Sequence, residues 1–114
     1  MKKYFYLILV LLFCSCKTNA ELSIERGVQL YDWGKFNDAI LAFNEAKYLQ
    51  ITNSKQTYYD LKLLAQIHYN LAITYAKLNM YDMAYKEALH AVSLVPNIEY
   101  REVLNLINEK IQNN

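Results

Sequence analysis

The chain has 114 residues, which is enough for one domain at most. Its 12 Lys and Arg nearly balance its 11 Asp and Glu, and this argues against nucleic-acid binding, which needs a basic surface. Only two glycines and one proline interrupt the chain, so an all-α fold is expected.

The first 15 residues predict an export signal. Lys2 and Lys3 supply positive charge, and the apolar run over residues 4–13 carries none. That run is shorter than the roughly 20 residues that a transmembrane helix needs. It ends at Phe13-Cys14-Ser15-Cys16, where a small residue stands directly before a cysteine.

This junction resembles the lipobox of bacterial lipoproteins. The resemblance implies cleavage after Ser15 and attachment of acyl chains to Cys16, which would anchor the chain to a membrane. An uncleaved N-terminal anchor and an ordinary secreted protein are the alternatives. Lys17 follows Cys16 in place of the aspartate that retains many lipoproteins in the inner membrane, so we expect an envelope location at the outer membrane.

After a tether over residues 16–22, the apolar periodicity predicts helices. These helices are expected over residues 21–33, 37–50, 57–78, 82–94 and 97–112. The residues between the predicted helices are of types that commonly end or cap a helix. Gly34 and Asn79 suit a left-handed backbone after a helix. Thr57 with Asp60 predicts a capping box, and Asn97 suits the first position of the last helix.

Residues 65–98 form a unit of 34 residues with small, aromatic and proline side chains at fixed places. Those side chains are Leu71, Ala72, Tyr75, Ala84, Ala91 and Pro96. A looser copy over residues 20–53 carries Gly27, Ala39, Phe43 and Ala46 at matching places. Both copies resemble the tetratricopeptide repeat.

The resemblance implies a domain over residues 23–114 that is a fragment of an α-solenoid. Two antiparallel helical hairpins would stack on each other, and helix 97–112 would cap the stack. Small residues would let the helices of each hairpin approach closely. Gly27 would then meet Ala39, and Ala72 would meet Ala84.

The resemblance also implies a groove, lined by the first helix of each repeat, that holds a peptide or helix of a partner protein. The expected lining residues are Ile24, Val28, Tyr31, Gln66, Tyr69, Asn70, Ile73 and Lys77. Asn70 stands where relatives use an asparagine to clamp a terminal carboxylate. The Lys and Arg of that clamp are missing here, so this specificity is not expected.

No catalytic or metal-binding pattern is found. His68 and His90 fall on different helices, without the i, i+4 spacing of a metal pair, and the glycines form no phosphate-binding loop. We therefore expect neither enzymatic activity nor a cofactor. The leading hypothesis is a membrane-anchored envelope lipoprotein that serves as a protein-protein interaction module. The alternative is a homo-oligomeric structural lipoprotein, or a surface-exposed one that contacts a host.

Overall fold

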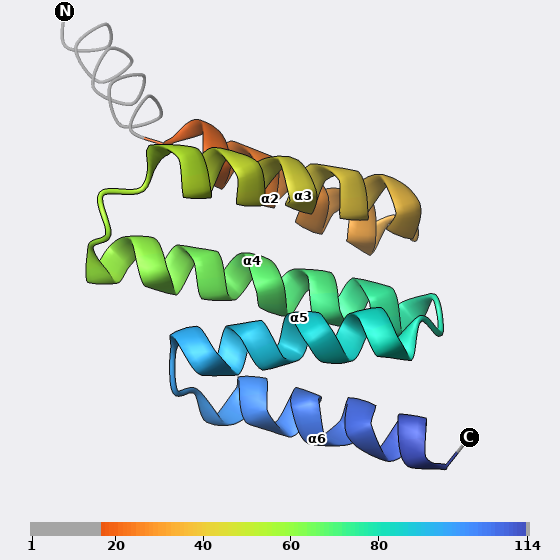
Figure 1. The fold of residues 1–114 in the computed structure, drawn as a ribbon. Coiled ribbons are helices and arrows are strands. Elements are labelled where there is room, and N and C mark those ends of the chain that lie inside the picture. The colour runs from red at the N-terminus through yellow and green to blue at the C-terminus, as the bar shows by residue number, and fades with distance from the viewer. Residues whose placement is uncertain (1–16, 114) are drawn as a thin grey trace, which may run out of the picture.

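The computed structural model describes residues 17–113, and the predicted signal 1–15 and the lipid attachment at Cys16 lie outside them. The described chain forms five α-helices joined by short connections, each antiparallel to the next (Figure 1). Their bounds are α2 Asn19–Asp32, α3 Phe36–Asn53, α4 Tyr58–Lys77, α5 Tyr81–Leu94 and α6 Ile98–Gln112. The predicted helices are confirmed, with ends shifted by no more than three residues.

The tether is shorter than the sequence suggested. Thr18 caps α2 because its hydroxyl oxygen accepts a hydrogen bond from the backbone N–H of Glu21 at 3.2 Å. The helix therefore begins at Asn19, and Ala20 is already buried in the core. Of the expected tether 16–22, the structure leaves only Lys17 and Thr18 ahead of the helix.

Local chemistry sets the other helix ends. Gly34 (φ 79°) and Asn79 (φ 60°) both take the left-handed conformation that ends a helix. The side chains of Thr57 and Asp60 form the expected capping box at the start of α4. The Asn97 side chain accepts hydrogen bonds from two backbone N–H groups in the first turn of α6.

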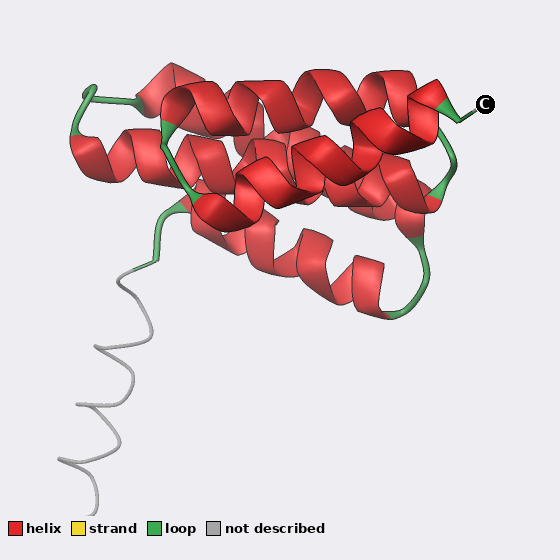
Figure 2. Cartoon of the chain, turned by 90° about the horizontal axis from the view of Figure 1, so that it is seen from below, coloured by secondary structure: helices red, strands yellow, loops and turns green. Residues whose placement is uncertain are grey.

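Each helix packs against its chain neighbours, and α2 and α6 also touch α4. The views in Figures 1 and 2 show these helices stacked along the chain, with connections only at the two ends. Small residues sit where helices approach each other, because a bulkier side chain would hold the backbones apart. The alanines that are fully buried in this way include Ala39, Ala46, Ala72, Ala84 and Ala91, whereas Pro96 is exposed.

The contact expected between Gly27 and Ala39 is not the closest one at the glycine. The ring of Phe43 lies against Gly27, and a Cβ built there would come within 2.5 Å of a ring carbon. Phe43 is 1% exposed and fills the space that a side chain at position 27 would need. The close approach of α2 and α3 therefore depends on Gly27, which leaves room for the ring of Phe43.

Within residues 17–113, no helix combines the length and the apolar character that crossing a bilayer requires.

Candidate functional site

Helices α2, α4 and α6 run in the same direction and border a groove of about 410 Å³. Helix α2 contributes one residue to it, α4 three, the start of α5 one and α6 four. The lining residues are Tyr31, Ile73, Ala76, Lys77, Tyr81, Val103, Leu106, Ile107 and Lys110.

The walls of this groove are mainly apolar, and its charged lining residues are Lys77 and Lys110. Within residues 17–113 neither lysine takes part in an ion pair, and the groove lining includes no carboxylate. Leu106 is 60% exposed, whereas Ile107, the next residue of α6, is buried and Val103 is partly buried. The groove therefore offers exposed apolar area next to two positive charges.

The aromatic side chains of the groove are held in place by contacts within the chain. The Tyr31 ring packs edge-on against Phe36, with 5.3 Å between ring centroids. The Tyr81 hydroxyl donates a hydrogen bond to the side-chain oxygen of Asn79 at 3.0 Å. Fixed side chains lose little conformational entropy when a ligand binds, which favours recognition.

Three of the residues expected in the groove, Tyr31, Ile73 and Lys77, line it together. Ile24 is instead buried in the core, and Val28 is exposed on α2 without lining the groove.

Gln66 and Tyr69 also lie elsewhere. Gln66 borders a separate hollow of about 270 Å³ near the start of α6. The Tyr69 hydroxyl donates to a carboxylate oxygen of Glu99 at 3.0 Å, and its ring stacks on Tyr100 at 4.8 Å. Burial, helped by the Glu99 carboxylate, raises the pKa of Tyr69 to about 12. This tyrosine thus binds α6 rather than facing an open groove.

Asn70 is 9% exposed, so it is not available at the surface as the predicted groove residue would be. Its backbone carbonyl accepts a hydrogen bond from the Thr74 hydroxyl at 2.6 Å. Its side-chain Nδ2 makes no hydrogen bond within the part of the chain that is described. The start of α6 contacts α4 at Tyr69, and the open groove is lined by later residues of α4, from Ile73 to Lys77.

A partly buried polar cluster, absent from the sequence-based prediction, joins α3, α4 and α5. The Nδ1 atom of His68 lies 2.5 Å from one carboxylate oxygen of Glu87, and the Lys47 ammonium lies 3.8 Å from the other. The His90 ring is 4.9 Å from that of His68. The two histidines are each eleven residues from the turn at Asn79, and this symmetry is the signal that could have paired them.

Burial raises the pKa of Glu87, but hydrogen bonding to His68 and the charge of Lys47 outweigh it and hold the pKa below its ordinary 4.5. Such a group stabilises the fold at pH values above 4.5, and this contribution is lost as the pH falls through the lowered pKa. Glu87→Gln is therefore expected to lower the free energy of unfolding by about 1 kcal/mol at neutral pH and by less in acid.

Urea unfolding at a series of pH values checks this expectation. Glu102→Gln on the exposed side of α6 serves as the control, and its stability should follow that of the unmodified chain. A constant difference between Glu87→Gln and the unmodified chain at all pH values would contradict the role of ionised Glu87.

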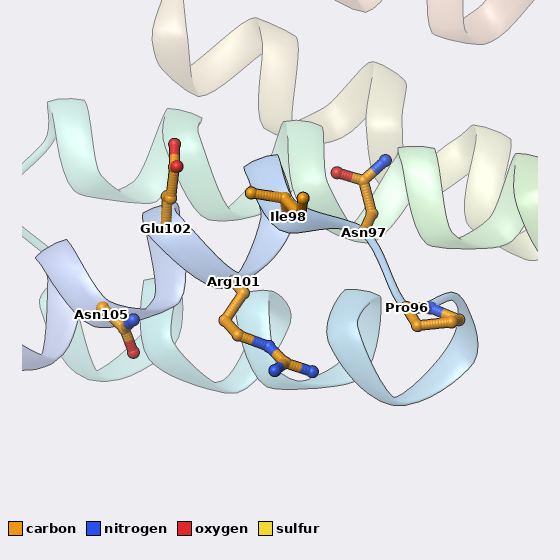
Figure 3. A pocket seen from close by; sticks show the side chains of 6 residues that line it. All are labelled: Pro96, Asn97, Ile98, Arg101, Glu102 and Asn105. Atoms are coloured by element: carbon orange, nitrogen blue, oxygen red, sulfur yellow. The ribbon is translucent and has the colours of Figure 1, made fainter.

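Neither a metal site nor the hollow at the α5–α6 turn offers a better arrangement of side chains within residues 17–113. In the range 17–113, no three His, Cys, Asp or Glu side chains are placed to hold a metal ion together. A hollow of about 280 Å³ at the α5–α6 turn is bordered by Arg101 and Glu102, but these side chains point in different directions (Figure 3). The groove between α2, α4 and α6 is therefore the best candidate site.

Comparison with protein-family models and with curated proteins finds no match to this chain. The function is therefore inferred from the apolar lining and the two lysines of the groove.

Proposed function

We propose that this chain is an anchored envelope lipoprotein whose groove binds a helix or peptide of another protein. The observation that carries the proposal is the exposed apolar groove with two lysines that make no ion pair within the described residues. Tetratricopeptide-like patterning of the two hairpins supports a binding role as well, because a fold of this kind exposes a concave surface.

The groove chemistry favours an occupant with apolar anchors flanked by carboxylates. An amphipathic helix presents apolar residues at positions i, i+3 or i+4, and i+7, which suits a narrow apolar groove. Acidic side chains beside those anchors would lie close to Lys77 and Lys110. The lysines would then favour an acidic partner and disfavour a basic one.

Anchoring would make such binding more effective. The junction at Phe13-Cys14-Ser15-Cys16 supports acylation of Cys16, with two or three chains giving firm attachment. A tethered binding module meets partners on the same membrane at a raised effective concentration. Even modest groove affinity would then be sufficient for function.

The proposal is tested with two labelled synthetic peptides that share apolar anchors, one with Glu and one with Lys at the flanking positions. Fluorescence anisotropy should show tighter binding of the Glu peptide to the full chain. Lys77→Glu/Lys110→Glu should weaken that binding roughly tenfold and improve binding of the Lys peptide, because attraction becomes repulsion at two exposed positions. Lys86→Glu, on an exposed part of α5, is the matched control.

Two outcomes would count against the proposal. One is that both peptides bind equally, or that the double variant binds as the control does. The other is a dimer in solution that Leu106→Asp converts to a monomer, since the groove would then be an interface between copies of the chain, as in the homo-oligomer hypothesis.

A further inference from the structure

We propose that one end of the helical stack rests directly on the headgroup layer of the membrane. This membrane-facing end consists of the first turns of α2 and α4 and the last turn of α3. The inference depends on the anchoring part of the proposed function and is independent of the groove.

The connection between the proposed anchor and α2 is short. Only Lys17 and Thr18 separate Cys16 from Asn19, the first residue of α2. Three residues span at most about 10 Å even when fully extended. An anchor at Cys16 would therefore hold the first turn of α2 within about 10 Å of the membrane surface. An uncleaved anchor over residues 4–13 would be joined to α2 by residues 14–18, so it would hold the first turn within about 20 Å of its own end.

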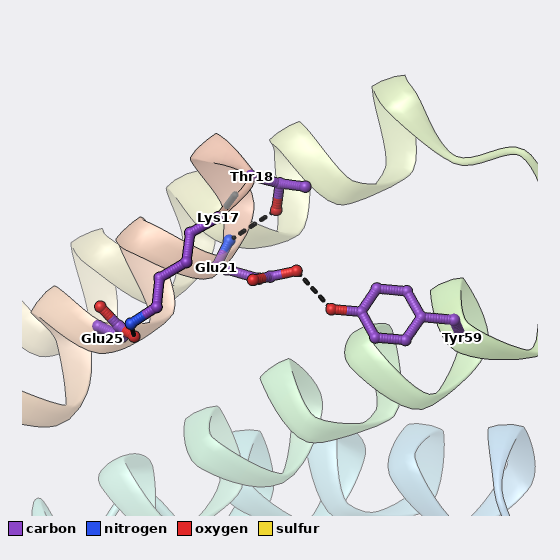
Figure 4. A network of polar contacts seen from close by, with 5 residues as sticks. All are labelled: Lys17, Thr18, Glu21, Glu25 and Tyr59. Atoms are coloured by element: carbon purple, nitrogen blue, oxygen red, sulfur yellow. Dashed lines mark hydrogen bonds and ion pairs between the residues drawn. The ribbon is translucent and has the colours of Figure 1, made fainter. Parts of the chain in front are cut away.

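The first turn of α4 is held beside this entry point. The Tyr59 hydroxyl donates a hydrogen bond to the carboxylate of Glu21, across from α4 to α2 (Figure 4). Lys17 pairs with Glu25 in the same region (Figure 4). Whatever fixes the start of α2 near the membrane thus brings the start of α4 there too.

Large apolar and aromatic side chains are exposed at this end, where water alone would not favour them. They are Leu22 at 50%, Ile51 at 59%, Tyr58 at 70% and Tyr59 at 57% exposure. Tyrosine suits the membrane interface because its ring is apolar and its hydroxyl can stay in contact with water. This composition matches a headgroup layer better than it matches bulk solvent.

The charges of this end point to the same surface. Lys55 and Lys62 are exposed cations, and the Lys62 ammonium lies 5.7 Å from the Tyr58 ring centroid. The nearby carboxylate of Asp60 accepts hydrogen bonds from the backbone N–H groups of Lys55 and Thr57 at 3.0 and 3.1 Å. At the membrane interface, Lys55 and Lys62 would contact anionic headgroups while their alkyl chains lie along the interface.

Trp33 makes the orientation measurable because it is the one tryptophan of the chain and is exposed just beyond the far end of α2. The 14 residues of α2 separate it from the membrane-facing end by about 20 Å. Full-length protein is reconstituted into phosphatidylcholine and phosphatidylglycerol vesicles whose lipids are brominated high on the acyl chains. Two further reporters are Trp33→Phe/Tyr58→Trp and Trp33→Phe/Ile51→Trp, both at exposed positions.

The reporters at positions 58 and 51 should lose most of their emission to the brominated lipids and shift to the blue, whereas Trp33 should keep its emission. Equal quenching of all reporters, or none at positions 58 and 51 in protein that floats with the vesicles, would overturn the proposed orientation. Protein that fails to float and carries an unmodified Cys16 by mass spectrometry would overturn the anchor and the orientation with it. The peptide-binding assay would still test the groove separately.

Discussion

Phe43→Ala is expected to lower the free energy of unfolding by about 3–5 kcal/mol, which is a large part of the stability of a small domain. The Phe43 side chain is 1% exposed and lies against Gly27. Because the glycine has no side chain that could move into the vacated space, truncation would leave a cavity between α2 and α3. Urea denaturation followed by circular dichroism measures the loss.

Tyr48→Ala provides the matched control for this experiment, because it removes an aromatic ring from the same helix at a position that is 69% exposed. Its expected cost is below about 1 kcal/mol. Equal losses of unfolding free energy for the two variants would show that the ring of Phe43 does not hold α2 and α3 together.

Leu71→Ala is expected to cost about 2–5 kcal/mol, with an effect that reaches every helix. Leu71 is fully buried in the second half of α4, and α4 is the one helix that touches the other four described helices. A cavity there should loosen both hairpins and α6 together. Hydrogen exchange should show backbone amides of α2 and α5 losing protection to the same extent.

The control for this second change is Leu89→Ala on α5, where the side chain is 44% exposed. It should leave exchange in α2 unchanged. If Leu71→Ala speeds exchange in α5 and leaves α2 protected, the two hairpins unfold independently, and α4 does not unite the stack.

The helices and their ends could be predicted because their causes are local. The capping box of Thr57 and Asp60 and the left-handed turns at Gly34 and Asn79 depend on residues within a few positions of each other. The same holds for Asn97, which caps α6 through the next three residues. Such local signals can be recognised in a single sequence.

The groove could be predicted only in part, because its extent depends on contacts between distant residues. The path of α6 after Pro96 decides which face of α4 is covered, and that path includes the stacking of Tyr69 on Tyr100. Pairing of His68 with Glu87 likewise needs the register of one helix against another. Periodicity shows that a helix has an apolar face, but it does not show which neighbour covers each part of that face.

The length of helix α4 also determines how far the groove lies from the membrane-facing end. The helix runs from Tyr58, at the end assigned to the membrane, to Lys77, in the groove, and its 20 residues span about 30 Å. With the helices upright on the bilayer, α4 would act as a spacer that holds a bound partner about that far above the lipid. Adding or removing one helical turn would change this height by about 5 Å, so helix length would determine which partners are within reach.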